Sequence, residues 1–179
     1  LFFFFQAVAG IRGSSTARGL GDVYERQHIL FKIQYPAEFH AQTAVEAAIK
    51  LHESVASKLE IIDKIVIRTQ EPAIRIISKV GKLANAADRD HCIQYMVAVG
   101  LIFGDLIAEY YEDDFHQENQ LIDKLRDKMI IEEDNQFSMD YLDPEKRSIA
   151  NAVQVFFNDG TCSDAVSYTH LTLPTIYSV

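Results

Sequence analysis

Residues 31–48 read FKIQYPAEFHAQTAVEAA and contain the end of a strand, a proline corner and the start of a helix. Apolar residues alternate along 28–35, which is the period of a strand with one apolar face. Pro36 has no backbone N–H and ends the strand ladder. Along 38–57 the apolar residues then recur every three or four positions, which predicts a helix. The stretch therefore predicts a strand that is joined to a helix by a sharp turn.

Outward from this stretch, the patterns predict a mixture of helices and a few strands. The expected elements are a strand at 59–70, a short helix at 71–80, a long helix at 86–104, short helices at 105–113 and 120–128, a strand at 129–134, a turn and half-helix at 143–151, and a strand at 152–161 that enters an Asp-Gly hairpin turn. These strands are too few and too unevenly spaced for a doubly wound parallel sheet. We therefore predict an α+β fold, in which a small, mostly antiparallel sheet has helices packed on one face.

Three residues add detail to the helix boundaries. Thr43 and Glu46 have the spacing of a capping box, so Thr43 is expected to start the regular part of the first helix. Pro72 falls in the first turn of the helix at 71–80, where a missing N–H has no cost, and Gly81 is expected to end that helix.

Length and charge bound the domain organisation and exclude some functions. A chain of 179 residues suits one ordinary domain, and a net charge of −9 argues against a nucleic-acid partner. The initial LFFFFQAVAG is shorter than the roughly 20 apolar residues of a membrane span, so we expect no membrane partner. Composition shifts predict a loop-rich segment at 1–21, an α+β domain at 22–166 and a non-native tail at 167–179.

No common catalytic or nucleotide-binding motif is present, so the candidate residues are single side chains. Lys32, beside the proline corner, is either an outward-facing lysine of a half-exposed sheet or a cation that faces a carboxylate. Tyr95 falls on the apolar stripe formed with Cys92, Met96 and Val99. It is therefore either a core phenol with a hydrogen-bond partner or a phenol that faces a site.

Two acidic stretches contain residue types that can bind metal ions. In DRDHCIQY, residues 88–95, adjacent helical side chains point about 100° apart, and Asp88 with Cys92 would make an unusual ligand pair. Capping of the helix is the simpler role for these acids. In EYYEDDFHQE, residues 109–118, the acids and His116 lack the pattern of a calcium loop, which favours a solvated surface. We expect no metal and no cofactor.

Three longer blocks carry a resemblance to a known family. FKIQYPAEFHAQTAVEAA, NAADRDHCIQYMVAVGLIFG with the following YYEDDF, and DPEKRSIANAVQVFF with the following DGT resemble the MmgE/PrpD family. The resemblance covers residues 22–161 and keeps the order of the family's blocks.

The resemblance implies a fold, an activity and a set of partners. It implies the α+β lid domain of a hydro-lyase that dehydrates 2-methylcitrate to 2-methyl-cis-aconitate in propionate catabolism, without an iron–sulfur cluster. The expected partners are a tricarboxylate substrate, a missing N-terminal helical domain and a second copy in a homodimer of the full-length protein. The location would be the mitochondrial matrix in a eukaryote and the cytoplasm in a bacterium. This fragment alone is expected to be inactive and to expose an apolar surface.

The resemblance also implies site residues. Lys32 and Tyr95 match pocket-lining positions of decarboxylase relatives and are predicted to be catalytic. Glu38 and His40 are predicted to bind substrate, although relatives have histidines where this chain has Glu38 and Gln42. Two alternatives stay open: a lyase similar to cis-aconitate decarboxylase or acting on another tricarboxylate, and a non-catalytic α+β interaction domain.

Overall fold

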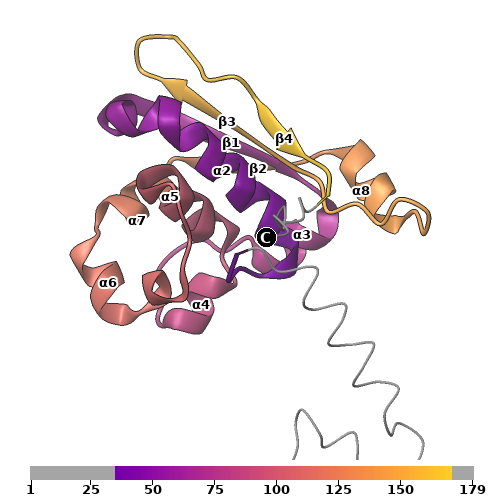
Figure 1. Cartoon of the computed structure of the whole chain (residues 1–179), viewed down its shortest axis with the longest axis horizontal. Helices are drawn as coiled ribbons and strands as arrows, with labels where there is room; N and C mark the ends of the chain where they lie inside the picture. The colour runs from indigo at the N-terminus through magenta and orange to yellow at the C-terminus, as the bar shows by residue number, and fades with distance from the viewer. Residues whose placement is uncertain (1–34, 171–179) are drawn as a thin grey trace, which may run out of the picture. The chain divides into compact units, whose positions relative to one another are not determined.

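The computed structural model describes residues 35–170, and its centre is a mixed four-stranded sheet (Figure 1). The strands lie in the order β2-β1-β3-β4, with bounds β1 Ile62–Thr69, β2 Met129–Glu133, β3 Asn151–Phe157 and β4 Val166–Tyr168. β1 pairs with β2 in parallel, while the β1–β3 and β3–β4 pairs are antiparallel. This arrangement confirms the predicted α+β fold with a mostly antiparallel sheet.

Helices surround this sheet on one side and at its ends. The α-helices are α2 Gln42–Val55, α3 Glu71–Ile77, α4 Ala86–Asp90, α5 Ile93–Phe103, α6 Asp113–Glu118, α7 Leu121–Arg126 and α8 Asn135–Leu142. Three short 3₁₀ helices are η2 Phe39–Ala41, η3 Ala56–Ile61 and η4 Ala108–Tyr111. The predicted strand at 28–35 lies outside the described residues, except for Tyr35.

One face of the sheet is covered and the other is polar. On β1, Ile65 and Ile67 are fully buried and Val66 between them is partly buried, whereas Lys64 before them and Arg68 after them are exposed. Helix α2 covers the apolar face, and α5 packs against α2 (Figure 1). Gly100 of α5 lies against Ala48 of α2 so closely that a Cβ at Gly100 would be 2.9 Å from the Ala48 Cβ. The core is therefore made of the strand residues, α2 and α5 in layers.

The segment at 86–104 is two helices, so the prediction of one long helix was wrong. The Asn85 side chain caps α4, and the chain leaves helical geometry at Cys92, whose φ and ψ are −131° and 103°. The break lets the buried Arg89 donate to the Tyr111 carbonyl at 2.7 Å and pair with Asp113. A buried guanidinium needs such partners, and a continuous helix pattern contains no sign of them.

The start of α2 also differs from the prediction. Ala41 is the residue that precedes the helix, so Thr43 and Glu46 do not form its capping box. The Thr43 hydroxyl donates instead to the Ile149 carbonyl at 2.6 Å, and it accepts from the Asn151 side chain at 2.7 Å. These bonds join the start of α2 to the start of β3, and they are tertiary contacts that local spacing does not reveal.

In the C-terminal half, the strands β2 and β3 were predicted, but β4 and one helix were not. Residues 143–147 form a turn and not a half-helix, and α8 precedes them. Asp134 caps α8 by accepting from the backbone of Gln136 and Phe137. The hairpin after β3 is confirmed, with Gly160 at a φ of 82°. Helix α8 is short and has no fully buried residue, so its apolar pattern is weaker than that of a core helix.

Two smaller boundaries can also be compared with the predictions. Helix α3 ends at Ile77, four residues before Gly81, so Gly81 does not end it. Residues 166–168 form β4, so the start of the C-terminal segment 167–179 lies in the sheet, while 171–179 lie outside the described residues. No helix within 35–170 has the length and apolar character needed to cross a membrane.

Candidate functional site

Glu38, His40 and Tyr141 form a hydrogen-bonded cluster at one end of the sheet. Glu38 accepts from the backbone N–H of His40 at 2.7 Å, and its Oε1 lies 2.8 Å from the His40 Nδ1. The His40 Nε2 lies 3.2 Å from the hydroxyl of Tyr141 on α8. Because an ionised carboxylate only accepts, the neutral ring carries its hydrogen on Nδ1 and presents the Nε2 lone pair to Tyr141. The order carboxylate, imidazole and phenol is that of a proton relay.

The backbone around this cluster is held by a glutamine and an asparagine. The Gln42 side chain donates to the carbonyls of Tyr35 and Ala37 at 2.8 and 2.7 Å, which fixes the turn after Pro36. The Asn151 side chain donates to the His40 carbonyl at 2.8 Å and so ties η2 to β3. Gln42 is therefore occupied with shaping the corner, and the cluster is placed by buried hydrogen bonds.

The cluster lies near Asp90 and His91, the last residue of α4 and the one after it. Burial opposes ionisation of Glu38, but hydrogen bonds and attraction from His40, with a smaller attraction from His91, lower the Glu38 pKa overall. Burial raises the pKa of Asp90, and the Glu38 charge raises it further. The His91 Nδ1 is 3.3 Å from Asp90. Two carboxyl groups with pKa values shifted in opposite directions are typical of sites that exchange protons.

Tyr95 lies apart from this cluster, in the core. It is fully buried, and its hydroxyl donates to the Tyr110 carbonyl at 2.6 Å. Its ring stacks with Tyr111 at 6.0 Å between centroids, and burial raises its pKa. This geometry favours the core phenol over the phenol that faces a site, because the hydroxyl already has a partner and is covered. Lys32 lies outside the described residues, so its predicted role stays a prediction.

The acids considered as metal ligands take part in other contacts. Asp88 accepts from the Ala84 N–H and pairs with Lys79, while the thiol of the buried Cys92 lies 3.7 Å from the Lys79 carbonyl. Within 35–170 no group of three or more His, Cys, Asp or Glu side chains is placed to hold a metal ion.

The acidic stretch at 109–118 forms an ion-pair network on the far side of α5. Asp113 pairs with the buried Arg89, and the His116 Nε2 lies 3.0 Å from Asp123, which also pairs with Arg126. The carboxyl residues of this stretch are exposed, as the predicted solvated surface requires, and the backbone forms η4 and α6. Its charges join helices to one another, as expected of a structural network.

The family comparison agrees with the blocks noted in the sequence. The model of the MmgE/PrpD C-terminal domain matches residues 35–170. The chain belongs to the MmgE/PrpD family. The Glu38, His40 and Tyr141 cluster and the α+β fold are therefore features of an MmgE/PrpD C-terminal domain.

The relatives of this MmgE/PrpD domain are longer than this chain, and their names contain 2-methylcitrate dehydratase. The 2-methylcitrate dehydratase of Salmonella typhimurium is 55% identical over 141 residues, which cover 77% of this chain and 29% of the relative. The probable 2-methylcitrate dehydratase of Saccharomyces cerevisiae is 53% identical over 156 residues, 86% of this chain and 30% of the relative. A mitochondrial 2-methylcitrate dehydratase of Yarrowia lipolytica is 49% identical, with 82% and 29% covered. The chain thus spans less than a third of the length of these relatives.

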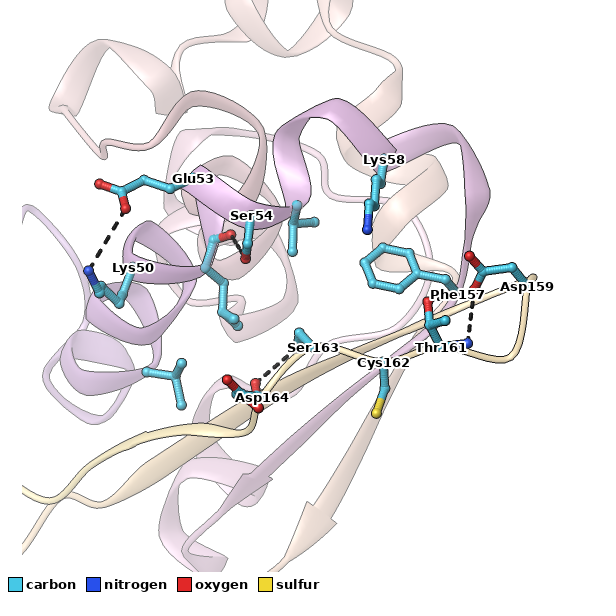
Figure 2. A pocket seen from close by; sticks show the side chains of 13 residues that line it. Lys50, Glu53, Ser54, Lys58, Phe157, Asp159, Thr161, Cys162, Ser163 and Asp164 are labelled. Atoms are coloured by element: carbon cyan, nitrogen blue, oxygen red, sulfur yellow. Dashed lines mark hydrogen bonds and ion pairs between the residues drawn. The ribbon is translucent and has the colours of Figure 1, made fainter.

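This MmgE/PrpD domain also has an open cleft at the opposite end of α2 (Figure 2). Its volume is about 480 Å³, and it lies between α2 and the hairpin of β3 and β4. Lys50 and Lys58 face it together with Glu53, Asp159 and Asp164, so both signs of charge are present. Glu38, His40 and Tyr95, the predicted site residues that the structure describes, do not line this cleft. It does not favour an anionic ligand and does not extend the Glu38 site.

Sequence reasoning found two members of the candidate site and missed the third. Glu38 and His40 were named from the corner and from the resemblance. Tyr141 is 101 positions from His40 and lies on the helix that was not predicted. Only the packing of α8 against the end of β1 brings the phenol to the imidazole.

Proposed function

We propose that this chain supplies the C-terminal α+β domain of a hydro-lyase that dehydrates 2-methylcitrate to 2-methyl-cis-aconitate. The names of the relatives from bacteria and yeasts, at about half identity or more, support this substrate. The observation that carries the proposal is the Glu38 and His40 pair. The Glu38 carboxyl has a lowered pKa and orients the His40 imidazole, and such a pair can transfer a proton.

Loss of water from a β-hydroxy acid needs two proton movements. A proton leaves the carbon next to a carboxylate, and the departing hydroxide gains a proton. Glu38 stabilises the positive charge that His40 acquires when its ring accepts a proton, and it holds the ring in one tautomer. In this proposal Lys32 binds a carboxylate of the substrate, because a lysine ammonium suits a tricarboxylate.

The remaining parts of the proposal follow the family resemblance. They are an N-terminal helical domain that this chain covers as a lid, a homodimer of the full-length protein, a reaction without an iron–sulfur cluster, and a role in propionate catabolism. The name of the Yarrowia relative supports a mitochondrial location if the source is a eukaryote, and the matrix is the compartment that the family resemblance implies. The isolated chain is expected to have negligible activity, because a site between two domains needs both.

A hybrid enzyme tests the proposal. The chain is joined to the preceding part of the Salmonella typhimurium relative, and 2-methylcitrate turnover is followed by the ultraviolet absorbance of the conjugated product, with a chelator present. We expect turnover that His40→Ala and Lys32→Ala each lower by at least about a hundredfold, the range of a lost proton-transfer group. His170→Ala, an exposed histidine, is the matched control and keeps full activity. A folded hybrid without turnover on 2-methylcitrate would contradict the proposed substrate.

A further inference from the structure

Both nitrogens of the His40 ring already have partners within the described chain. Nδ1 lies 2.8 Å from Glu38, and Nε2 lies 3.2 Å from the Tyr141 hydroxyl. The whole residue is only 8% exposed, while Tyr141 is partly exposed. A substrate that approached this surface would therefore meet the phenol before the imidazole. Both His40 ring nitrogens already contact Glu38 or Tyr141, so neither is free to contact a substrate directly.

Tyr141 is also fixed in place by the contacts of its helix. The Asp134 N–H donates to the carbonyl of Thr69 at 2.8 Å, which joins the start of α8 to the end of β1. The Ser138 hydroxyl accepts from the Glu71 N–H at 2.9 Å and donates to Glu133 at 2.7 Å. These bonds hold α8 against α3 and β2, so the position of the phenol over His40 is determined by the fold. A catalytic side chain must be kept close to the geometry of the reaction, and these contacts of α8 do so for Tyr141.

The surface around Tyr141 suits a site that another part of the protein covers. Leu142, which follows Tyr141 at the end of α8, is 76% exposed, and Phe39 beside His40 is 37% exposed. Exposed apolar side chains around a polar cluster are typical of a surface that is buried in the assembled protein. The relatives are more than three times as long as the matched region, so the rest of the protein is the expected cover.

We propose that Tyr141 is the group that exchanges the proton with the substrate, and that Glu38 and His40 act through it. This inference rests on the proposed dehydration. The phenol oxygen takes the proton from the substrate carbon while its own proton moves to the His40 Nε2. The electron pair of the C–H bond forms the double bond as the C–O bond breaks. The leaving hydroxide then takes a proton back from the same relay and departs as water, so no other acid or base is required.

Further charged groups near the relay come from the end of α4. Asp90 and His91, at the end of α4, exert their fields on Glu38, and Glu38 is next to His40 on the corner. The pH dependence of the relay therefore includes these groups, and a change at Tyr141 must be separated from them. A variant that alters only the acidity of the phenol makes that separation.

The test uses the hybrid enzyme and three variants. Tyr141→Phe is expected to lower kcat at least a hundredfold with KM changed less than about threefold, because the phenol acts in the transition state. Replacement of Tyr141 by a fluorinated tyrosine, whose hydroxyl is more acidic, is expected to shift the pH profile of kcat to lower pH. Tyr110→Phe removes a hydroxyl from a ring that stacks on Phe115 at 4.5 Å and keeps normal kinetics.

The outcomes distinguish failure of the proposed relay from failure of the proposed dehydratase function. If Tyr141→Phe keeps the kcat and pH profile of the unsubstituted hybrid while His40→Ala loses activity, the relay is wrong and the dehydratase proposal stands. If the hybrid has no turnover, the proposed function fails, and nitrogen NMR of isotope-labelled histidine still tests the contact. An Nε2 resonance of His40 that is the same in Tyr141→Phe would overturn the relay, whereas a displaced resonance supports it.

Discussion

Loss of the hydroxyl group should destabilise the fold at Tyr95 and not at Tyr111, although the two rings stack on each other. Tyr95 donates to the Tyr110 carbonyl at 2.6 Å and is fully buried. The Tyr111 hydroxyl is also buried, but within the described residues it has no hydrogen-bond partner. Their rings are 6.0 Å apart, so both substitutions keep the same aromatic packing and change only one oxygen each.

Tyr95→Phe is expected to lower the free energy of unfolding by about 1–2 kcal/mol, because it removes the hydrogen bond that a fully buried hydroxyl donates to the Tyr110 carbonyl. Tyr111→Phe is expected to change the free energy of unfolding by less than about 0.5 kcal/mol or to raise it. The reason is that the Tyr111 hydroxyl loses its hydrogen bonds to water on folding and gains no partner in the described residues. Urea unfolding followed by circular dichroism measures both, and an unchanged slope shows that the unfolded states are comparable.

The same pair tests whether Tyr95 is catalytic. If Tyr95 is a core phenol, Tyr95→Phe changes kcat of the hybrid enzyme less than about threefold, in proportion to its modest loss of stability. A hundredfold fall in kcat with unchanged stability would refute the reasoning and restore Tyr95 as a site residue. Equal destabilisation by Tyr95→Phe and Tyr111→Phe would refute the assignment of the hydrogen bond.

Two further predictions concern a glycine and a carboxylate. Gly104→Ala should lower the free energy of unfolding by about 2 kcal/mol or more, because Gly104 has a φ of +70° and an added Cβ would lie 2.7 Å from the His52 ring. Gly160→Ala should lower it by only about 1 kcal/mol, because Gly160 has a φ of +82° but open space around it. Urea unfolding measures both values. Equal costs would contradict the ring contact. The lowered pKa of Glu38 stabilises the fold fully above its ordinary value of 4.5, and this contribution is lost as pH falls through the folded pKa. Comparison of unfolding at several pH values should show this acid-side loss, and a Glu38→Gln variant with the same pH dependence would contradict it.

Strong local patterns were predicted well because a single element produces them. The alternation of β1 places Ile65 and Ile67 in the core and Arg68 outside, as the apolar runs indicated. The hairpin after β3 followed from its Asp-Gly turn. The helices that were misjudged are those whose boundaries depend on distant partners. Arg89 needs the Tyr111 carbonyl, and the resulting break in the helix is absent from any local period.

The candidate site shows the same division. The sequence by itself determined the fold class, the proline corner that presents Glu38 and His40, and the membership of the MmgE/PrpD family, because periodicity, turn chemistry and long similar blocks are properties of the chain alone. Only the tertiary structure decided that Tyr95 is covered in the core and that Tyr141 meets the His40 ring. The burial of Tyr95 and the contact between residues 101 positions apart both depend on how α5 and α8 pack. A short helix with no fully buried residue carries no local signal of the side chain that it will contact.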